Sequence, residues 1–268
     1  MQSTKQSKVN KTIIQWTDKS HNFWHGCNKL SPGCKFCYMY RLKDQNGQDG
    51  SDIYRLSDKT FYAPLYETNA CMMFTCSFSD FFLKEADCWR EEAWSVIKRT
   101  PHIIWQILTK RPERILECLP DDWGEGYPNV WLGVSVETQD YLYRAEVLSK
   151  VPAKIRFISA EPLLGEIDFL VEKDGKRFID DFHWVILGGE SGNDNGPYGY
   201  RLSEVSWYER AIKDLKDNSN VAVFNKQLGC HLRNELKLKH YHGGKMEEWA
   251  KNLQIREFPL ENLVYTES

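Results

Sequence analysis

Seven short apolar runs divide the chain, and polar or charged residues follow each of them. The runs are rich in β-branched and aromatic residues and lie at residues 13–16, 71–76, 103–108, 130–134, 155–158, 184–187 and 221–224. Short runs of this composition, bounded by turn signals, are typical of strands that are buried on both faces. From the second run to the sixth they recur roughly every 25 to 30 residues, about the length of one strand–helix unit.

Helical patterns fill several of the intervals between these runs. Residues 89–99 and 140–150 each place apolar side chains on one face, and Ser203 is expected to cap a helix that reaches about residue 217. Strands that alternate with helices indicate a parallel sheet. We therefore expect an α/β fold that forms a complete or partial (β/α) barrel, with a doubly wound open sheet as the alternative.

The division of the chain follows from the same pattern. Residues 12–229 would form the barrel, residues 1–11 a flexible terminus, and residues 230–268 a C-terminal extension packed on the barrel. The formal net charge of −3 gives no general attraction to nucleic acid or to a membrane surface. No apolar run approaches the ~20 residues of a membrane span, and the polar N-terminus lacks the apolar segment of a signal peptide. We expect a cytoplasmic protein with no membrane partner, whose eight cysteines are reduced thiols or metal ligands.

Three of these cysteines lie close together in the sequence. Cys27, Cys34 and Cys37 have the spacing C-x6-C-x2-C, and Pro32 and Gly33 supply a tight bend between the first two. Thiolates that are gathered in this way usually share a cation, and soft sulfur ligands favour zinc or an iron–sulfur cluster. A structural zinc site needs four ligands, whereas a four-iron cluster held by three cysteines keeps one iron free.

Polar side chains also follow the expected strands, at the ends where parallel α/β folds bind their ligands. These residues, in chain order, are Ser77, Ser79 and Asp80; Thr109, Lys110 and Arg111; Ser135 and Glu137; Ser159 and Glu161; Gly188, Gly189 and Glu190; and Asn225, Lys226 and Gln227. Because the three-cysteine segment follows the first expected strand, it should open onto the same mouth as these residues.

The chain resembles the radical S-adenosylmethionine (SAM) superfamily, and more closely the phage Gp37/Gp68-like family (DUF5131). The resemblance runs from about Ile14 to Pro259 and rests on residues 15–18, 26–27, 31–38, 77–80, 108–113, 130–137, 156–163, 188–192 and 224–227. Two features differ from the commonest superfamily pattern. The first cysteine gap is six residues instead of three, and the Gly-Gly-Glu sequence follows the sixth expected strand instead of the second.

The resemblance implies a radical SAM enzyme in which Cys27, Cys34 and Cys37 hold a [4Fe-4S] cluster. An electron from the cluster would split SAM into methionine and a 5′-deoxyadenosyl radical, which abstracts hydrogen from a substrate. An external electron donor of the flavodoxin or ferredoxin type is implied as a partner. The phage-like association suggests a nucleobase, nucleotide or nucleic acid as the substrate, and a bacterial cell or phage-infected host as the setting.

Roles for the other residues follow from the same resemblance and from their chemistry. Phe36 would lie near the adenine of SAM, or pack the loop onto the barrel. Asp80 with Ser77 or Ser79 would accept the SAM amino group, and Ser135 or Glu137 the ribose hydroxyls. Gly188 and Gly189 would let the backbone approach the adenine edge. The residues expected to bind the substrate or the SAM carboxylate are Lys110, Arg111, Glu190 and Lys226. Catalytic roles are expected of Glu161 and of Cys76, which is a candidate hydrogen-atom donor.

Two other classes of function stay open at this point. A structural zinc-binding interaction module would need a fourth ligand, for which His25 is the nearest candidate. A cluster protein for electron transfer or sensing would keep the three thiols without cleaving SAM. Of the remaining cysteines, Cys88 and Cys118 are expected in the core. Cys230 with the nearby histidines is interpreted as structural instead of a second metal site.

Overall fold

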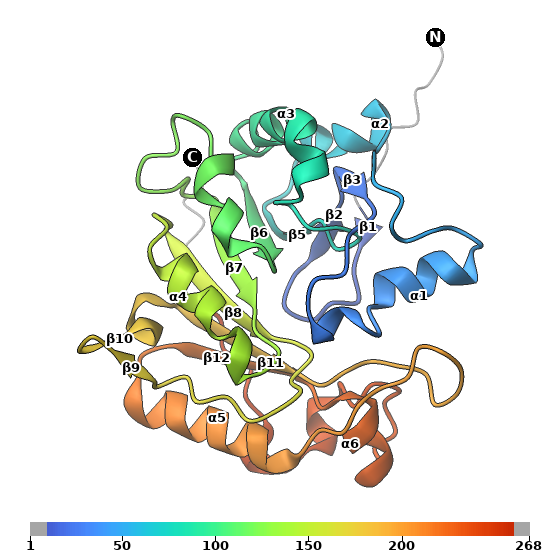
Figure 1. Ribbon diagram of the computed structural model, residues 1–268, viewed down its shortest axis with the longest axis vertical. Helices are drawn as coiled ribbons and strands as arrows, with labels where there is room; N and C mark the ends of the chain where they lie inside the picture. The colour runs from blue at the N-terminus through green and yellow to red at the C-terminus, as the bar shows by residue number, and fades with distance from the viewer. Residues whose placement is uncertain (1–9, 260–268) are drawn as a thin grey trace.

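A curled sheet of seven parallel strands organises the computed structural model, which describes residues 10–259 (Figure 1). In sheet order the strands are β2 (Lys19–His21), β5 (Cys71–Thr75), β6 (Ile103–Thr109), β7 (Val130–Ser135), β8 (Ile155–Ala160), β11 (Trp184–Gly188) and β12 (Ala222–Gln227). A short strand, β1 (Asn10–Lys11), pairs antiparallel with β2 at one edge. Six of the seven expected strands are therefore confirmed.

The strands lie side by side in the order in which they occur along the chain. This order contains no reversal, so the sheet is not doubly wound, because that architecture needs a switch point where the order changes direction. β1 and β12 end the strand order without pairing to each other, which leaves an open half-barrel. The partial (β/α) barrel is the architecture that the alternating pattern predicted.

The helices are α1 (Tyr38–Gln45), α2 (Asp58–Phe61), α3 (Asp87–Lys98), α4 (Tyr143–Ser149), α5 (Val205–Asn218) and α6 (Gly229–Glu235). Two small antiparallel strand pairs, β3 (Trp24–His25) with β4 (Tyr54–Arg55) and β9 (Glu172–Lys173) with β10 (Lys176–Arg177), lie outside the main sheet. Among the described residues 10–259, none of these helices has the length and apolarity needed to cross a bilayer.

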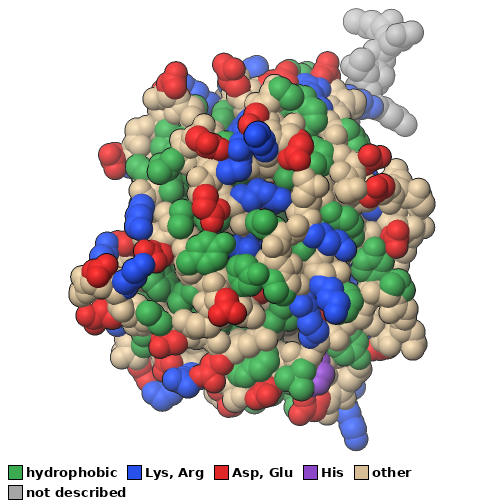
Figure 2. All heavy atoms as spheres, in the orientation of Figure 1, with side chains coloured by type: hydrophobic (Ala, Val, Ile, Leu, Met, Phe, Trp, Pro, Cys, Tyr) green, Lys and Arg blue, Asp and Glu red, His purple; other side chains and the backbone are tan. Residues whose placement is uncertain are grey.

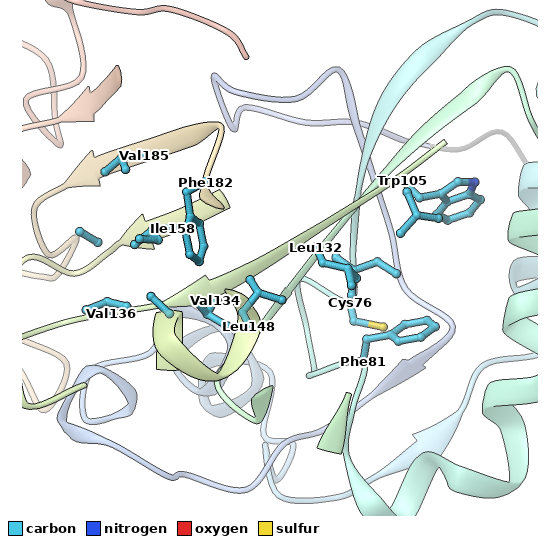
Figure 3. Packing of buried hydrophobic residues seen from close by; sticks show 14 of the residues in the cluster. Cys76, Phe81, Trp105, Leu132, Val134, Val136, Leu148, Ile158, Phe182 and Val185 are labelled. Carbon is cyan, nitrogen blue, oxygen red and sulfur yellow. The ribbon is translucent and has the colours of Figure 1, made fainter. Parts of the chain in front are cut away.

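Side chains on the two faces of the sheet form two separate hydrophobic layers. The outer layer, between the sheet and its helices, includes Trp105, Val134 and Leu148 (Figure 3). The inner layer fills the floor of the half-barrel with Trp16, Phe74, Ile104, Trp131, Phe157, Trp184, Ile186 and Phe224. Alternate residues of each strand serve the two layers, as the pleat of a strand requires. The floor closes the amino end of the half-barrel, so only the carboxyl end is left for polar residues.

The prediction of a first strand at residues 13–16 is wrong. The first parallel strand is β2 at Lys19–His21, and the segment before it is irregular. Ile13 is 82% exposed, whereas Trp16 is buried against the rings of Phe74, Phe157 and Trp184. The apolar character of this run therefore reflects one large side chain that fills the floor, and not a strand with two buried faces.

Two smaller expectations also fail. Ser203 does not cap α5: it lies one residue before the N-cap position, Glu204, and its hydroxyl instead donates to the Tyr208 hydroxyl at 3.5 Å. Cys88 is exposed in the first turn of α3 instead of buried in the core, while Cys118 is buried as expected. In both cases an amphipathic pattern located the helix correctly, but the role of a residue at or just before the start of the helix was predicted wrongly.

The C-terminal extension lies along the free edge of the sheet. The backbone of Glu257 donates to Val223 at 2.9 Å, and Asn225 donates to Ile255 at 2.9 Å, beside an antiparallel bridge between Phe224 and Arg256. Covering an edge strand in this way satisfies backbone groups that would otherwise be open to another chain. At the other end, residues 10 and 11 form β1. Residues 1–9 and 260–268, which the expected terminus and extension include, lie outside the described part of the chain.

The floor of the half-barrel gives the first testable prediction. Trp16→Ala should lower the free energy of unfolding by about 3–5 kcal/mol, because it removes a fully buried aromatic side chain and leaves a cavity. Ile13→Ala, in the same segment but exposed, should change it by less than about 0.5 kcal/mol. Urea denaturation followed by tryptophan fluorescence and circular dichroism measures both values. Equal losses for the two variants would show that Trp16 does not fill the floor.

Candidate metal centre at the mouth of the half-barrel

The three cysteines lie on one loop, residues 26–38, between β3 and α1. Gly26 begins the loop with φ of 87°, and a Cβ at this position would lie 1.9 Å from the Asp52 carbonyl oxygen, so only glycine fits. A short 3-10 helix at Pro32–Cys34 makes the bend that the sequence predicted. Cys27, Cys34 and Cys37 are all partly exposed, and none is in a disulfide.

Side chains that follow two strands, and one from the segment between β11 and α5, hold this loop. Arg111, after β6, donates to the Asn28 carbonyl at 2.9 Å. The Ser31 hydroxyl donates to Glu137, after β7, at 2.6 Å. Arg201, in the segment after β11, donates to the Pro32 carbonyl at 3.0 Å. The loop therefore lies over the carboxyl ends of the strands, as the sequence predicted.

Positively charged groups approach the thiols from the sheet side. The Arg111 Nη1 atom lies 3.9 Å from the sulfur of Cys27 and 3.0 Å from the Asp80 carboxylate. Burial raises the pKa of Cys27 to about 12, with Asp80 adding to the rise and Arg111 opposing it. For Cys34 burial also acts to raise the pKa, but Lys110 and hydrogen bonds from Leu30 and Ser31 outweigh it, so that pKa is lowered.

The Asp80 carboxylate is a junction, by which we mean a carboxylate that accepts hydrogen bonds from several segments of the chain and so joins them. One oxygen accepts from the Thr109 hydroxyl at 2.7 Å and from the backbone of Phe82 at 2.9 Å. The other accepts from the backbone of Lys110 and from the Arg111 guanidinium, each at 3.0 Å. With four donors, Asp80 fixes the residues that follow β6 and aims Arg111 at the cysteine loop.

Glu137 is a second junction, with no exposed surface. Its oxygens accept from Ser31 at 2.6 Å and from the buried Arg144 of α4 at 2.9 Å, and the Lys110 ammonium lies 3.7 Å away. The Lys110 pKa is raised: burial opposes the rise, but Glu137, Cys34 and Cys37 outweigh it. A Cβ on Gly33 would lie 2.5 Å from Glu137, so the bend of the loop packs directly on this carboxylate.

The far side of the mouth carries a third charged pair. Glu161 accepts from Lys226 at 2.7 Å and from the Ser159 hydroxyl at 3.1 Å. A Cβ at Gly188 would lie 2.4 Å from the Glu161 carboxylate, so this glycine makes room for the pair. β7, β8 and β12 thus contribute Glu137, Glu161 and Lys226 to one mouth, above the apolar floor.

Glu190, expected to bind substrate, is buried and forms an ion pair with Arg201. The guanidinium of Arg201 also lies 5.4 Å from the ring centre of Phe36, between the last two cysteines. Sequence reasoning missed Arg201 and Arg144, because neither follows a strand directly or belongs to a recognisable motif. In the sequence only their charge marks these two residues: Arg144 lies in an amphipathic helical segment and Arg201 in a loop.

The serines after β5 bind the cysteine segment. The Ser79 hydroxyl donates to the Gly26 carbonyl at 2.5 Å, and the Ser77 carbonyl accepts from the Tyr38 hydroxyl at 2.5 Å. Cys76 is buried in the outer hydrophobic layer beside Phe81, and burial raises its pKa (Figure 3). Its sulfur thus lies on the helix side of the sheet instead of in the mouth, so we leave it out of the proposed chemistry.

Within residues 10–259 the structure places no three or more His, Cys, Asp or Glu side chains close enough to share one metal ion. His25, the candidate fourth zinc ligand, stacks on Phe78 and lies 3.4 Å from the Tyr54 hydroxyl. Burial and then Lys43 lower the pKa of His25 to about 4. Cys230, proposed as structural, contacts both the backbone nitrogen and the carbonyl of Gly192, at 3.3 and 3.2 Å.

Comparison with known proteins places the chain in a family. It belongs to the family described as "Protein of unknown function (DUF5131)", whose model matches residues 11–258. No curated protein and no solved structure matches the chain. The description of the family names no activity.

The Glu137 junction gives the second prediction. Glu137→Gln should destabilise the protein by about 3–5 kcal/mol, because it leaves the buried Arg144 charge without a counter-charge. Glu146→Gln is the matched control on the same helix, α4. Glu146 pairs with Lys150 and Lys173 at the surface, so its loss should cost less than about 1 kcal/mol. Chemical denaturation under reducing conditions measures both, and a small loss for Glu137→Gln would contradict the role of the junction.

Proposed function

We propose that this protein is a radical SAM enzyme in which Cys27, Cys34 and Cys37 hold a [4Fe-4S] cluster. The observation that carries the proposal is the position of the three-thiol loop: residues after β6 and β7 and Arg201 of the β11–α5 segment hold it at the polar mouth of a parallel half-barrel. Ligand sites of parallel α/β folds lie at this end of the strands.

The donor set suits a cluster better than a single ion. A tetrahedral zinc ion with Zn–S bonds of about 2.3 Å requires sulfurs about 3.8 Å apart and a fourth ligand. The described residues offer no such convergent group, and His25 is engaged with Tyr54 and Phe78. A four-iron cluster takes three thiolates when one of its irons stays open, and three is the number that the loop offers.

When bound, the cluster would supply the electron that cleaves SAM to methionine and a 5′-deoxyadenosyl radical. The chain's own residues would bind and orient. Arg111 and Lys110 offset the negative charge of the thiolates. The Glu161–Lys226 pair offers one anionic and one cationic group to the amino and carboxylate ends of a ligand at the mouth.

The remaining predicted cofactor contacts keep their roles in this proposal, with one constraint. Phe36 lies under Arg201, and Gly188 leaves space beside Glu161, so both border the mouth. Both oxygens of Asp80 already have two donors each, so an ammonium group would share Asp80 with Arg111 or use Ser77 and Ser79. Ser135, Glu137 and Gly189 are buried, and Glu137 already accepts from Ser31 and Arg144, so the ribose and adenine contacts expected of them stay predictions.

The loop is near enough to the surface for an external electron donor to reach it. Leu30 is 51% exposed, and Asn28 and Lys29 beside it are exposed as well. A small donor protein of flavodoxin or ferredoxin type would dock over these residues. The substrate class we propose is a nucleobase or nucleotide, in the cytoplasm of a bacterial cell or phage-infected host.

Reconstitution under anaerobic conditions tests the proposal. The protein is loaded with iron and sulfide, and its absorption and electron paramagnetic resonance spectra are recorded before and after adding SAM and dithionite. We expect close to four irons per chain, a signal that changes with SAM, and release of 5′-deoxyadenosine. Cys34→Ala should lose most of the bound iron, while Cys88→Ala, an exposed thiol outside the loop, should retain it.

Three results would contradict the proposal in different ways. Tight zinc binding without cluster uptake would make the loop a structural metal site. A cluster that neither responds to SAM nor cleaves it would make the protein an electron carrier or sensor. Equal iron retention by Cys34→Ala and Cys88→Ala would show that the loop does not hold the cluster.

Arg111 gives a further prediction for the loaded protein. Removing its charge with Arg111→Gln should shift the cluster midpoint potential to a more negative value, because a cation 3.9 Å from the Cys27 sulfur stabilises the reduced, more negative cluster. Arg114→Gln is the control: this arginine follows the same strand but contacts Phe82 and Asp87 instead of the loop. A redox titration monitored by absorption measures both. An unchanged potential in Arg111→Gln would show that its charge does not act on the cluster.

A further inference from the structure

A surface hollow of about 440 Å³ lies beside the mouth. The segment 192–195, which follows β11, forms one wall, and Arg233, Tyr241 and His242 of the C-terminal extension form the other. Figure 1 shows the loop between β11 and α5 on the same side of the molecule as α1 and α6. The volume lies within the range of about 300–1,000 Å³ that is usual for small-molecule sites.

The hollow is joined to the mouth through α1 and β12. Arg41 of α1 donates to the Ser191 carbonyl at 3.1 Å, at the start of the 192–195 wall. The backbone of Gly229, two residues beyond the end of β12, donates to the His242 carbonyl at 3.1 Å, and β12 itself carries Lys226. Lys226 is the residue that pairs with Glu161 in the mouth. A ligand in the hollow would therefore lie next to the proposed reaction site.

The walls are fixed before any ligand arrives. The Cys230 sulfur contacts the Gly192 nitrogen and carbonyl at 3.3 and 3.2 Å, which joins α6 to the first residue of the segment. Arg233 donates to both oxygens of Asp194 at 2.6 and 2.8 Å, and Tyr200 and Asn234 also bond to this carboxylate. Walls that need no rearrangement spare the ordering cost of binding.

The side chains of the hollow suit a flat ring with hydrogen-bonding edges. Tyr241 is 52% exposed, and its ring centre lies 4.0 Å from that of His242 and 4.6 Å from that of His240. Exposed aromatic rings of this kind are the surfaces on which nucleobases stack. The amides of Asn193 and Asn195 on the opposite wall each carry a donor and an acceptor, as a base edge requires.

The charge around the hollow suits an anionic group on that ring. Arg233 lines the hollow and is paired with Asp194, and burial followed by the charges of Arg41, His240, Lys226 and Arg233 lowers the pKa of His242 to about 4. On the face that Figure 2 shows, Lys and Arg side chains are intermixed with acidic and apolar side chains and form no long basic stripe. With the formal charge of −3, this arrangement favours one nucleotide over an extended strand.

We propose that this hollow binds a single nucleotide, with its base stacked on Tyr241 and its phosphate among the cations around His242. That this nucleotide is the substrate rests on the proposed function, because it would lie beside the radical site. The same chemistry is available from a free nucleoside monophosphate or from one unit of a single-stranded nucleic acid.

The test uses the full chain without a cluster, so it does not depend on the proposed reaction. Adenosine 5′-monophosphate, cytidine 5′-monophosphate, a six-nucleotide single-stranded DNA and inorganic phosphate are each titrated by calorimetry at low and at physiological salt. We expect saturable binding of a nucleotide and a loss of about 5- to 150-fold in affinity for Tyr241→Ala, the range of one base-stacking contact. Tyr241→Phe should retain the affinity, because it keeps the ring.

Tyr66→Ala is the matched control, since Tyr66 is an exposed tyrosine before β5, at the opposite ends of the strands. Tighter binding of the oligonucleotide than of the monophosphates identifies a unit of a strand, and equal binding identifies a free nucleotide; both support the site. Three results would overturn it: no saturable nucleotide binding, equal affinity in Tyr241→Ala, or inorganic phosphate binding as tightly as a nucleotide. Failure of the cluster to assemble would sink the proposed function and leave this binding result untouched.

Discussion

The attachment of the cysteine loop to the strand ends is the constraint on which the site depends. Glu137 has no contact with water and joins Ser31 of the loop to Arg144 of α4, with Lys110 beside them. A buried charge of this kind is stable only while its partners are in place. The loop, β6, β7 and α4 are therefore held in one arrangement, and the three thiols keep their position relative to the mouth.

Asp80 and Glu190 extend the same principle to the two sides of Glu137. Asp80 accepts three of its four hydrogen bonds from Thr109, Lys110 and Arg111 at the end of β6, and through Arg111 it reaches Cys27 and Asn28. Glu190 pairs with Arg201, which reaches Pro32 and Phe36. Asp80 and Glu190, which the sequence suggested as ligand-binding residues, thus each orient an arginine toward the loop. The groups with most freedom at the mouth are Lys110 and the Glu161–Lys226 pair.

The division of the sheet into two hydrophobic layers explains why the chemistry gathers at one end. Trp16, Trp131 and Trp184 fill the inner face near the amino ends of the strands, and this apolar floor leaves no room or solvation for charge. Farther along the same strands the inward residues become Ser135, Ser159 and Gly188, and beyond them come Glu137 and Glu161. The strands therefore carry small and then charged residues above the apolar floor.

The sequence by itself determined the strand–helix alternation, six of the seven strands and the loop that carries Cys27, Cys34 and Cys37. These features are local: apolar runs, turn residues and cysteine spacing are visible within a few residues. The tertiary structure alone decided that Trp16 closes the floor, that Cys88 faces solvent and that Arg111, Arg144 and Arg201 are aimed at the loop or its supports. It also brought His242 beside Asn193, although the two are far apart in sequence. Long-range pairing of charges and rings depends on which strand ends become neighbours, and no local pattern in the chain encodes that.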